Sequence, residues 1–200
     1  MKSFTEEKRK KIVEKLFKEG KLLFQQYGIK KTNIRELAAS VGIAPGTFYQ
    51  FFRSKEELYF RILEKEELKI KTTLLEKYSG SEPNEETLNQ FLLDGIELVL
   101  TNDFLKKAII EGDIQNLVQQ LSQDVLEQHM AEDEHLLIPM LKKWKISDSN
   151  QQLKLFSSVL RALFMLVTHQ KEIGEDHFRY TIEFYTKAIS AQIFKERKTK

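Results

Sequence analysis

The 200-residue sequence contains no cysteine, only three prolines and no apolar run of the length that crosses a membrane. The absence of cysteine excludes disulfides and thiolate chemistry, and it is compatible with a reducing cytosol. A membrane-spanning helix needs about 18 apolar residues, whereas the best candidate, residues 159–167, is interrupted by Arg161. The N-terminus also lacks the uninterrupted apolar region of a signal peptide. We therefore expect a cytoplasmic protein with no membrane partner.

The motifs that carry most enzymatic chemistry are missing as well, because the sequence has no glycine-rich phosphate loop, nucleophile elbow or zinc-spaced cluster. One metal-site pattern is present: Glu132 and His135 have the Glu-x-x-His spacing of helical di-iron and di-manganese sites, with His129 and Asp133 nearby. Such a site needs a second Glu-x-x-His and two further glutamates. The single copy lies in an acidic run that is typical of a solvated helix face. We therefore predict no metal, no cofactor and no enzymatic activity.

Strictly alternating β-branched runs are absent, and nearly the whole chain has the periodicity of amphipathic helices. The sequence therefore predicts an all-α fold of about nine helices. They are expected near residues 5–27, 33–41, 45–51, 54–77, 85–101, 103–112, 114–143, 150–173 and 175–195. The seventh contains Pro139, where we expect a kink or a break. We expect two domains, residues 1–53 and residues 54–200.

Charge is distributed unevenly along the chain. The net charge is +2, but residues 1–55 hold 13 Lys/Arg and 5 Asp/Glu, whereas residues 56–200 hold 19 and 25. A basic N-terminal end on an acidic body favours a polyanion as the partner of that end. The lysine cluster at residues 8–11, taken alone, is more typical of a solvated helix face.

The segment after the first helix has the features that a helix-turn-helix requires. Two helices that cross closely need a small residue at the crossing, which Ala38 supplies. The turn four residues later needs a left-handed backbone, which Gly42 adopts without strain. Pro45 suits the first turn of the next helix, because the N–H that it lacks is not needed there. Two predicted caps frame the motif: Thr32 or Asn33 with Glu36, and Ser54 with Glu57.

Residues 12–58 resemble the DNA-binding domain of the TetR family of bacterial transcriptional regulators. The matching residues are Leu23-Phe24, Gly28, Thr32, Leu37-Ala38, Gly42-Ile43, Gly46-Thr47-Phe48-Tyr49, Phe52 and Ser54-Lys55-Glu56-Glu57-Leu58. The resemblance covers about a quarter of the chain. Relatives commonly carry serine and a polar residue where Ala44 and Pro45 stand, and many carry histidine or a second aromatic where Gln50 and Phe51 stand. At Ala44-Pro45 one hydroxyl and one side-chain donor to phosphate are therefore missing, whereas Gln50-Phe51 indicates a different operator sequence.

Ten residues are predicted to form the DNA interface: Thr32, Asn33, Arg35, Ala44, Pro45, Gly46, Thr47, Tyr49, Gln50 and Lys55. Gln50 can form a bidentate pair with adenine and is the candidate for base reading, while Arg35 is placed to reach guanine or a phosphate. Lys55 lies in the first turn of a helix, where free N–H groups and the helix dipole favour an anion. The resemblance implies phosphate contacts for the hydroxyls of Thr47 and Tyr49.

The last two helices are apolar on more than one face, which indicates that they are covered both by their own core and by another subunit. In the resembled family these two helices pair across a two-fold axis into a four-helix bundle. The resemblance therefore implies a homodimer with recognition helices on the two half-sites of a palindromic operator. The predicted interface residues are Phe156, Leu160, Leu163, Phe178, Ile182, Tyr185 and Ile189.

Members of the family usually carry an effector pocket in the C-terminal domain. The candidate lining residues are Phe91, Ile96, Phe104, His129, Met140, Trp144 and Phe164. For each of them, ordinary core packing is the more frequent role of such a residue. A pocket lined in this way suits an apolar or aromatic small molecule.

These features predict a ligand-responsive repressor, in which an effector changes the separation of the two recognition helices and so releases DNA. Repression, rather than activation, is implied by the resemblance alone. Two alternatives stay open. One is a helical metal-binding or enzymatic bundle with an incidental helix-turn-helix, and the other is a DNA binder without an effector.

Overall fold

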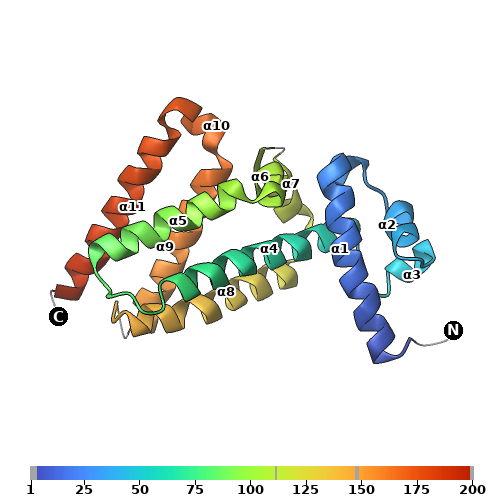
Figure 1. Cartoon of the computed structure of the whole chain (residues 1–200), viewed down its shortest axis with the longest axis horizontal. Coiled ribbons are helices and arrows are strands. Elements are labelled where there is room, and N and C mark those ends of the chain that lie inside the picture. Colours follow the sequence, from blue (N-terminus) through green and yellow to red (C-terminus); the bar gives the residue numbers. More distant parts are fainter. Residues whose placement is uncertain (1–3, 111, 147–148, 199–200) are drawn as a thin grey trace. The chain divides into compact units, whose positions relative to one another are not determined.

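The computed structural model describes residues 4–110, 112–146 and 149–198, with the side chains of residues 110, 115, 133–137 and 196–198 left out. These residues form eleven helices and no strand, which confirms the all-α class (Figure 1). In chain order the helices are α1 (Glu6–Lys31), α2 (Ile34–Ser40), α3 (Pro45–Phe48), α4 (Lys55–Lys77), α5 (Glu85–Thr101), α6 (Asp103–Ile110), α7 (Asp113–Gln120), α8 (Gln123–Lys143), α9 (Asn150–Thr168), α10 (Gln170–Ile173) and α11 (Glu175–Lys198).

The chain divides into two compact units. Unit 1 consists of Met1–Glu66 and Asp113–Leu121, and unit 2 consists of Glu67–Gly112 and Ser122–Lys200. Helix α4 therefore contributes its first half to unit 1 and its second half to unit 2. Helix α7 belongs to unit 1 although it is distant from the other helices of that unit in sequence.

Local sequence explains where the helices of unit 1 begin and end. Regular winding of α1 is interrupted at Gly28, which has a φ of +75°. Asn33 caps α2, because its Oδ1 accepts a hydrogen bond from Glu36 N at 3.0 Å while the Glu36 carboxylate accepts one from Asn33 N at 3.1 Å. Ser54 caps α4 with its hydroxyl oxygen, which accepts a hydrogen bond from Glu57 N at 3.1 Å. Both predicted caps are confirmed.

Unit 1 has its own apolar core, in which α2 and α3 pack beside α1 (Figure 1). Its most deeply buried side chains are Leu16, Phe24, Leu37, Ala38, Phe48, Leu58 and Ile62. Gly20 permits a close approach in this core, because a Cβ added there would lie 3.2 Å from Leu58 Cδ2 and 3.6 Å from Leu37 Cδ2. The helix-turn-helix is therefore held against α1 and α4 by packing as well as by its own turn.

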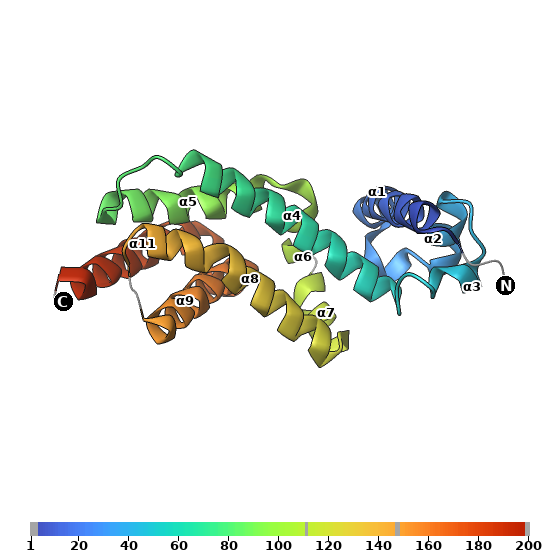
Figure 2. The ribbon, with the colours of Figure 1, turned by 90° about the horizontal axis from the view of Figure 1, so that it is seen from below.

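Unit 2 is an all-helical bundle. Helix α11 packs along α5, and α9 packs against α8 and α6 (Figure 2). An aromatic cluster of Tyr78, Phe91 and Trp144 fills part of its core, with ring centroids between 5.4 and 6.4 Å apart. All three rings are buried, and they meet edge to face.

A polar cluster fixes the junction of α4 and α5 within unit 2. The Asp94 carboxylate accepts hydrogen bonds from Lys77, from the Tyr78 hydroxyl at 2.6 Å and from Gln90 at 2.9 Å. Burial acts to raise the pKa of Asp94, but these hydrogen bonds outweigh burial and hold the pKa below its usual value of 3.8. Burial also raises the pKa of the Tyr78 phenol, and the hydrogen bond to Asp94 raises it further.

Two predicted helix boundaries were wrong. Pro139 lies inside α8 without ending it, and the break falls instead at residues 121–122, between α7 and α8. Ser122 has an extended backbone at that break and precedes the first residue of α8, so the chain restarts its helix there. The expected helix at 150–173 ends at Thr168 and is followed by the short α10. Part of the predicted cap cluster at 147–150 lies outside the described residues.

Candidate nucleic-acid interface

The turn between α2 and α3 is set by two hydrogen bonds and one glycine. Ile43 N donates to the Ala38 carbonyl at 3.0 Å and Gly42 N donates to the Ala39 carbonyl at 3.1 Å, so carbonyls at the end of α2 are satisfied. Gly42 has a φ of +74°, in the left-handed region. Ala38 is fully buried. Ala38 and Gly42 therefore have the roles that the sequence predicted.

Helix α3 is short and is anchored by one ring. It begins at Pro45 and ends at Phe48, three residues earlier than expected. The Phe48 side chain is fully buried, and its ring centroid lies 5.9 Å from that of Phe52, which also lies in the core as predicted. Gln50 N donates to the Thr47 carbonyl at 3.0 Å, so the chain continues past α3 as a tight turn.

On the other side of this anchor lies a set of outward-facing residues, here called the recognition row: Ala44, Pro45, Gly46, Thr47, Tyr49 and Gln50. Five of them are exposed and Thr47 is half-buried. Tyr49 is 59% exposed, so packing accounts for less than half of its surface. A Cβ added at Gly46 would meet nothing within 4 Å, so another molecule can approach the backbone closely there. The structure thus brings six of the ten predicted contact residues together.

Arg9 of α1 holds the end of the recognition row and was missed in the sequence. Its guanidinium donates to the Gln50 carbonyl at 3.1 Å and lies 4.9 Å from the centre of the Phe51 ring. Phe4 adds a second ring against Phe51, with centroids 6.0 Å apart. These contacts orient the Gln50 backbone while its side chain remains exposed. They join residues more than 40 positions apart, and no local pattern signals them.

The start of α2 places two further predicted residues at the surface of unit 1. Asn33 is exposed, but its side-chain oxygen is occupied by the cap on Glu36 N. Arg35 is exposed, and within the part of the chain that the structure describes it makes no hydrogen bond or ion pair. Arg35 is therefore available to a phosphate or a base edge.

Thr32 and Lys55 have structural contacts that the sequence did not predict. Thr32 is fully buried and its hydroxyl donates to the Gly28 carbonyl at 2.8 Å, so its side chain is not at the surface. The Lys55 ammonium donates to the carbonyls of Ile29 at 2.6 Å and Thr32 at 2.9 Å. It thereby links the start of α4 to the end of α1, and two of its three N–H donors are used in doing so.

The predicted pocket residues all belong to unit 2. Phe91, Phe104, Met140 and Trp144 are buried, whereas Ile96, His129 and Phe164 are half-buried. The structure brings Phe91 and Trp144 into contact, with ring centroids 5.7 Å apart. These two rings therefore fill the core around Tyr78.

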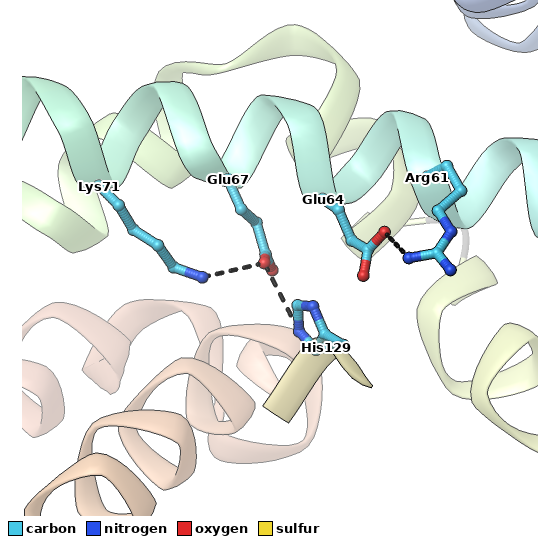
Figure 3. A network of polar contacts seen from close by, with 5 residues as sticks. All are labelled: Arg61, Glu64, Glu67, Lys71 and His129. Carbon is cyan, nitrogen blue, oxygen red and sulfur yellow. Dashed lines mark hydrogen bonds and ion pairs between the residues drawn. The ribbon is translucent and has the colours of Figure 1, made fainter. Parts of the chain in front are cut away.

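Figure 3 shows ion pairs along α4. Arg61 pairs with Glu64 at 2.9 Å. Further along the helix, Glu67 lies between Lys71 at 3.4 Å and His129 of α8 at 3.7 Å. His129 thus faces a carboxylate and is a polar residue of unit 2.

Most of the predicted dimer residues face the core of unit 2. Phe156, Leu163, Phe178 and Ile182 are each at most 5% exposed, Leu160 and Ile189 are half-buried, and Tyr185 is 45% exposed. The outward large apolar side chains of the same two helices are Leu155, Met165, Tyr180, Phe184 and Tyr185, and only Tyr185 was among the predicted residues. Because both helices are apolar on several faces, the sequence did not indicate which face is outward.

The described side chains contain no group of three or more potential metal ligands. Glu132 is exposed, and the side chains of its predicted partner His135 and of the nearby Asp133 are among those left out. Among the helices that the structure describes, none is long and apolar enough to span a membrane.

Comparison with known proteins finds a family match within unit 1. Residues 16–62 match the family model of the bacterial regulatory proteins of the tetR family. This stretch contains the first helix from Leu16 onward, the turn, the recognition row and the beginning of α4. No curated protein matches the chain by sequence.

Several solved structures share the fold over nearly the whole length of both chains. A TetR-family transcriptional regulator from Pectobacterium atrosepticum has a TM-score of 0.65 at 14% identity, covering 94% of this chain and 95% of its own. RolR, solved in complex with resorcinol, has a TM-score of 0.63 at 15% identity, with 94% of each chain covered. The fatty acid degradation regulator FadR from Bacillus halodurans has a TM-score of 0.52 at 14% identity, with 96% of each covered. With its helix-turn-helix and its exposed row, the stretch 16–62 is thus similar to the bacterial regulatory proteins of the tetR family, and the chain as a whole shares its fold with a solved TetR-family regulator.

Proposed function

We propose that this protein is a cytoplasmic one-component repressor that binds a palindromic operator as a homodimer and leaves it when an effector binds. Residues 1–53 read the DNA, and residues 54–200 bind the effector and the second subunit. The observation that carries the proposal is the recognition row, in which five of the six residues are exposed while Phe48 beneath it is fully buried. A surface of this kind is anchored to the core and is accessible to a DNA groove.

Within the row, Gln50 reads a base and the other members position the duplex. The Gln50 amide can donate to and accept from adenine in the major groove, and Arg9 fixes the backbone from which it extends. Tyr49 and Thr47 offer hydroxyls to phosphates, and Arg35 reaches the backbone or a guanine from the start of α2. Lys55 has one N–H donor left for a phosphate.

A substitution at Gln50 tests this assignment. We expect Gln50→Ala to change the preferred base at one position of each half-site, with a discrimination loss of about 1–3 kcal/mol. Gln26→Ala is the matched control, because Gln26 is an exposed glutamine of the same unit outside the row. The assignment fails if both variants bind the same set of random duplexes as the wild type, measured by sequencing the bound DNA.

The homodimer is supported by the outward apolar side chains of α9 and α11. Tyr180 and Phe184 are 70% and 71% exposed and lie four residues apart, on one face of α11. Leu155 and Met165 are 55% and 47% exposed on α9. Large apolar side chains that cluster at a surface mark an interaction site, and a two-fold dimer buries the same patch on both subunits.

The effector is an aromatic or apolar small molecule that also carries hydrogen-bonding groups. RolR, which shares the fold, was solved with resorcinol. In the present chain Asn89 Oδ1 and Ser190 Oγ are buried, and within the described residues they have no hydrogen-bond partner. Buried polar atoms without partners are uncommon, and a ligand hydroxyl would satisfy them.

Thermal unfolding in the presence of simple phenols, with resorcinol as the first probe, tests the effector proposal. A phenol that binds the folded chain raises the Tm and lowers DNA affinity, and Asn89→Leu removes both effects. If such compounds change neither the Tm nor the DNA affinity while the protein still binds DNA, the result favours the alternative of a DNA binder without a phenolic effector.

A further inference from the structure

A groove lies in unit 1 beside the recognition row. It has a volume of about 630 Å³ and runs between the first half of α1 and the turn that joins α2 to α3. Ala44 and Thr47, two members of the row, also line the groove. The groove is therefore continuous with the surface proposed to face DNA.

The wall that α1 contributes is strongly basic. It carries four lysines and one glutamate: Lys8, Lys11, Lys15, Lys18 and Glu14. The lysines follow one another at intervals of three and four residues, so they lie on one face of the helix. Lys11 pairs with Glu7 at 2.6 Å, but both side chains are more than two-thirds exposed. An exposed pair of this kind contributes little and exchanges readily.

Lys15 and Lys18 are the two most available cations of the groove. Both are exposed, and among the residues that the structure describes neither makes a hydrogen bond or an ion pair. Their ammonium groups therefore add to the local positive potential without compensation from a carboxylate partner. Such a site favours an anion at low and moderate salt.

The length of the lysine row favours an extended polyanion over a single small anion. From Lys8 to Lys18 the helix rises about 15 Å. One strand of duplex DNA presents a phosphate for every ~3.4 Å of helix axis. The row thus matches several consecutive phosphates, whereas one phosphate ion can contact only neighbouring lysines.

We propose that this groove holds the phosphate backbone of the DNA strand that passes the recognition row. The inference rests on the proposed function, since it assigns a second contact surface to the same operator. Lys15 and Lys18 bind phosphates, whereas the Glu14 carboxylate repels the phosphates because both are negatively charged. The surface is independent of base sequence, so it contributes equally to all duplexes.

The salt dependence of binding tests the proposal. The double variant Lys15→Ala/Lys18→Ala is compared with the matched double variant Lys10→Ala/Lys30→Ala, which removes the same charge from exposed positions of α1 outside the groove. We expect the groove variant to reduce the slope of log Kobs against log salt concentration by roughly 1.8, because each lost phosphate contact accounts for about 0.9. The control should lose less than half as much, and Glu14→Gln should bind more tightly than wild type.

Equal slope losses in the two double variants would show that only net charge matters, and would contradict the proposal that the groove binds the DNA backbone. Thermal unfolding followed by circular dichroism ensures that the variants compared are folded. Failure of the wild type to bind any duplex defeats the proposed function itself, whereas wild-type binding with an unchanged slope in the groove variant defeats only this inference. Titration with inorganic phosphate tests whether the groove binds a small free anion instead of the DNA backbone. Saturable binding that Lys15→Ala/Lys18→Ala abolishes, with the DNA slope intact, would make the groove a small-anion site.

Discussion

Gly42 is the residue on which the turn of the helix-turn-helix depends most directly. Its φ of +74° lies in a region that side chains with a Cβ avoid, and nothing lies within 4 Å of the position where that Cβ would be. The cost of a substitution here is therefore backbone strain alone. It can be measured without interference from a steric clash.

We expect Gly42→Ala to lower the free energy of unfolding by about 1–2 kcal/mol, the cost of left-handed backbone for an L-residue. Urea unfolding should show a lower midpoint with an unchanged m-value. Gly46→Ala is the control, because its site is equally open and its φ is not positive. A stability loss at Gly46 as large as that at Gly42 would contradict this account.

Lys55 acts first on the structure of unit 1, since two of its donors reach the carbonyls of Ile29 and Thr32. Lys55→Met keeps most of the apolar stem and removes the ammonium. We expect a loss of about 1–3 kcal/mol in the free energy of unfolding, because two carbonyls lose a charged donor. Unchanged stability with weakened DNA binding would instead assign Lys55 to phosphate binding alone.

At the scale of the helices, the sequence predicted the elements whose ends depend on neighbouring residues. The Asn33 and Ser54 caps, the glycine turn and the bounds of α5 follow from short-range signals, and all are as expected. The break at residues 121–122 was missed because Pro139 was the stronger local signal, although α8 accommodates that proline.

In the candidate site, too, some features were predictable from neighbouring residues and others were not. The recognition row follows from its position after the turn, so it was predictable from the sequence. Arg9 and the carbonyl contacts of Lys55 depend on segments that are distant in sequence, and so does the burial of Thr32. The outward face of α9 and α11 depends on what packs against the other faces.

The junction of α4 and α5 should make stability depend on pH. Hydrogen bonds from Lys77, Tyr78 and Gln90 outweigh burial and lower the pKa of Asp94 in the folded state, so its carboxylate stabilises the fold above the unfolded pKa of 3.8. That contribution is lost as pH falls from about 4 through the folded pKa.

We expect Asp94→Asn to be less stable than wild type at pH 7 and the difference to shrink below pH 4, as measured by urea unfolding at each pH. Glu97→Gln, an exposed carboxylate on the same helix, serves as the control. A difference between Asp94→Asn and wild type that stays constant from pH 7 to pH 3 would contradict the assigned role.

At the scale of the whole molecule, the proposed function requires two copies of the chain. We expect Phe184→Glu to shift the protein toward monomer, because a charge would replace a ring that is 71% exposed on the proposed interface. Met130→Glu alters an exposed apolar residue of α8 in the same unit and should leave the dimer intact. Sedimentation at micromolar concentration distinguishes the two states, and a wild type that is already monomeric would rule out the dimer.

Selection of bound sequences from a pool of random duplex DNA is the most direct test of dimeric operator binding. We expect enrichment of a palindrome whose half-sites are separated by a helical turn, about 34 Å, or more. We also expect the enrichment pattern to change with Gln50→Ala. Binding with no enriched sequence, or an enriched site without two-fold symmetry, would contradict a dimeric operator-binding regulator.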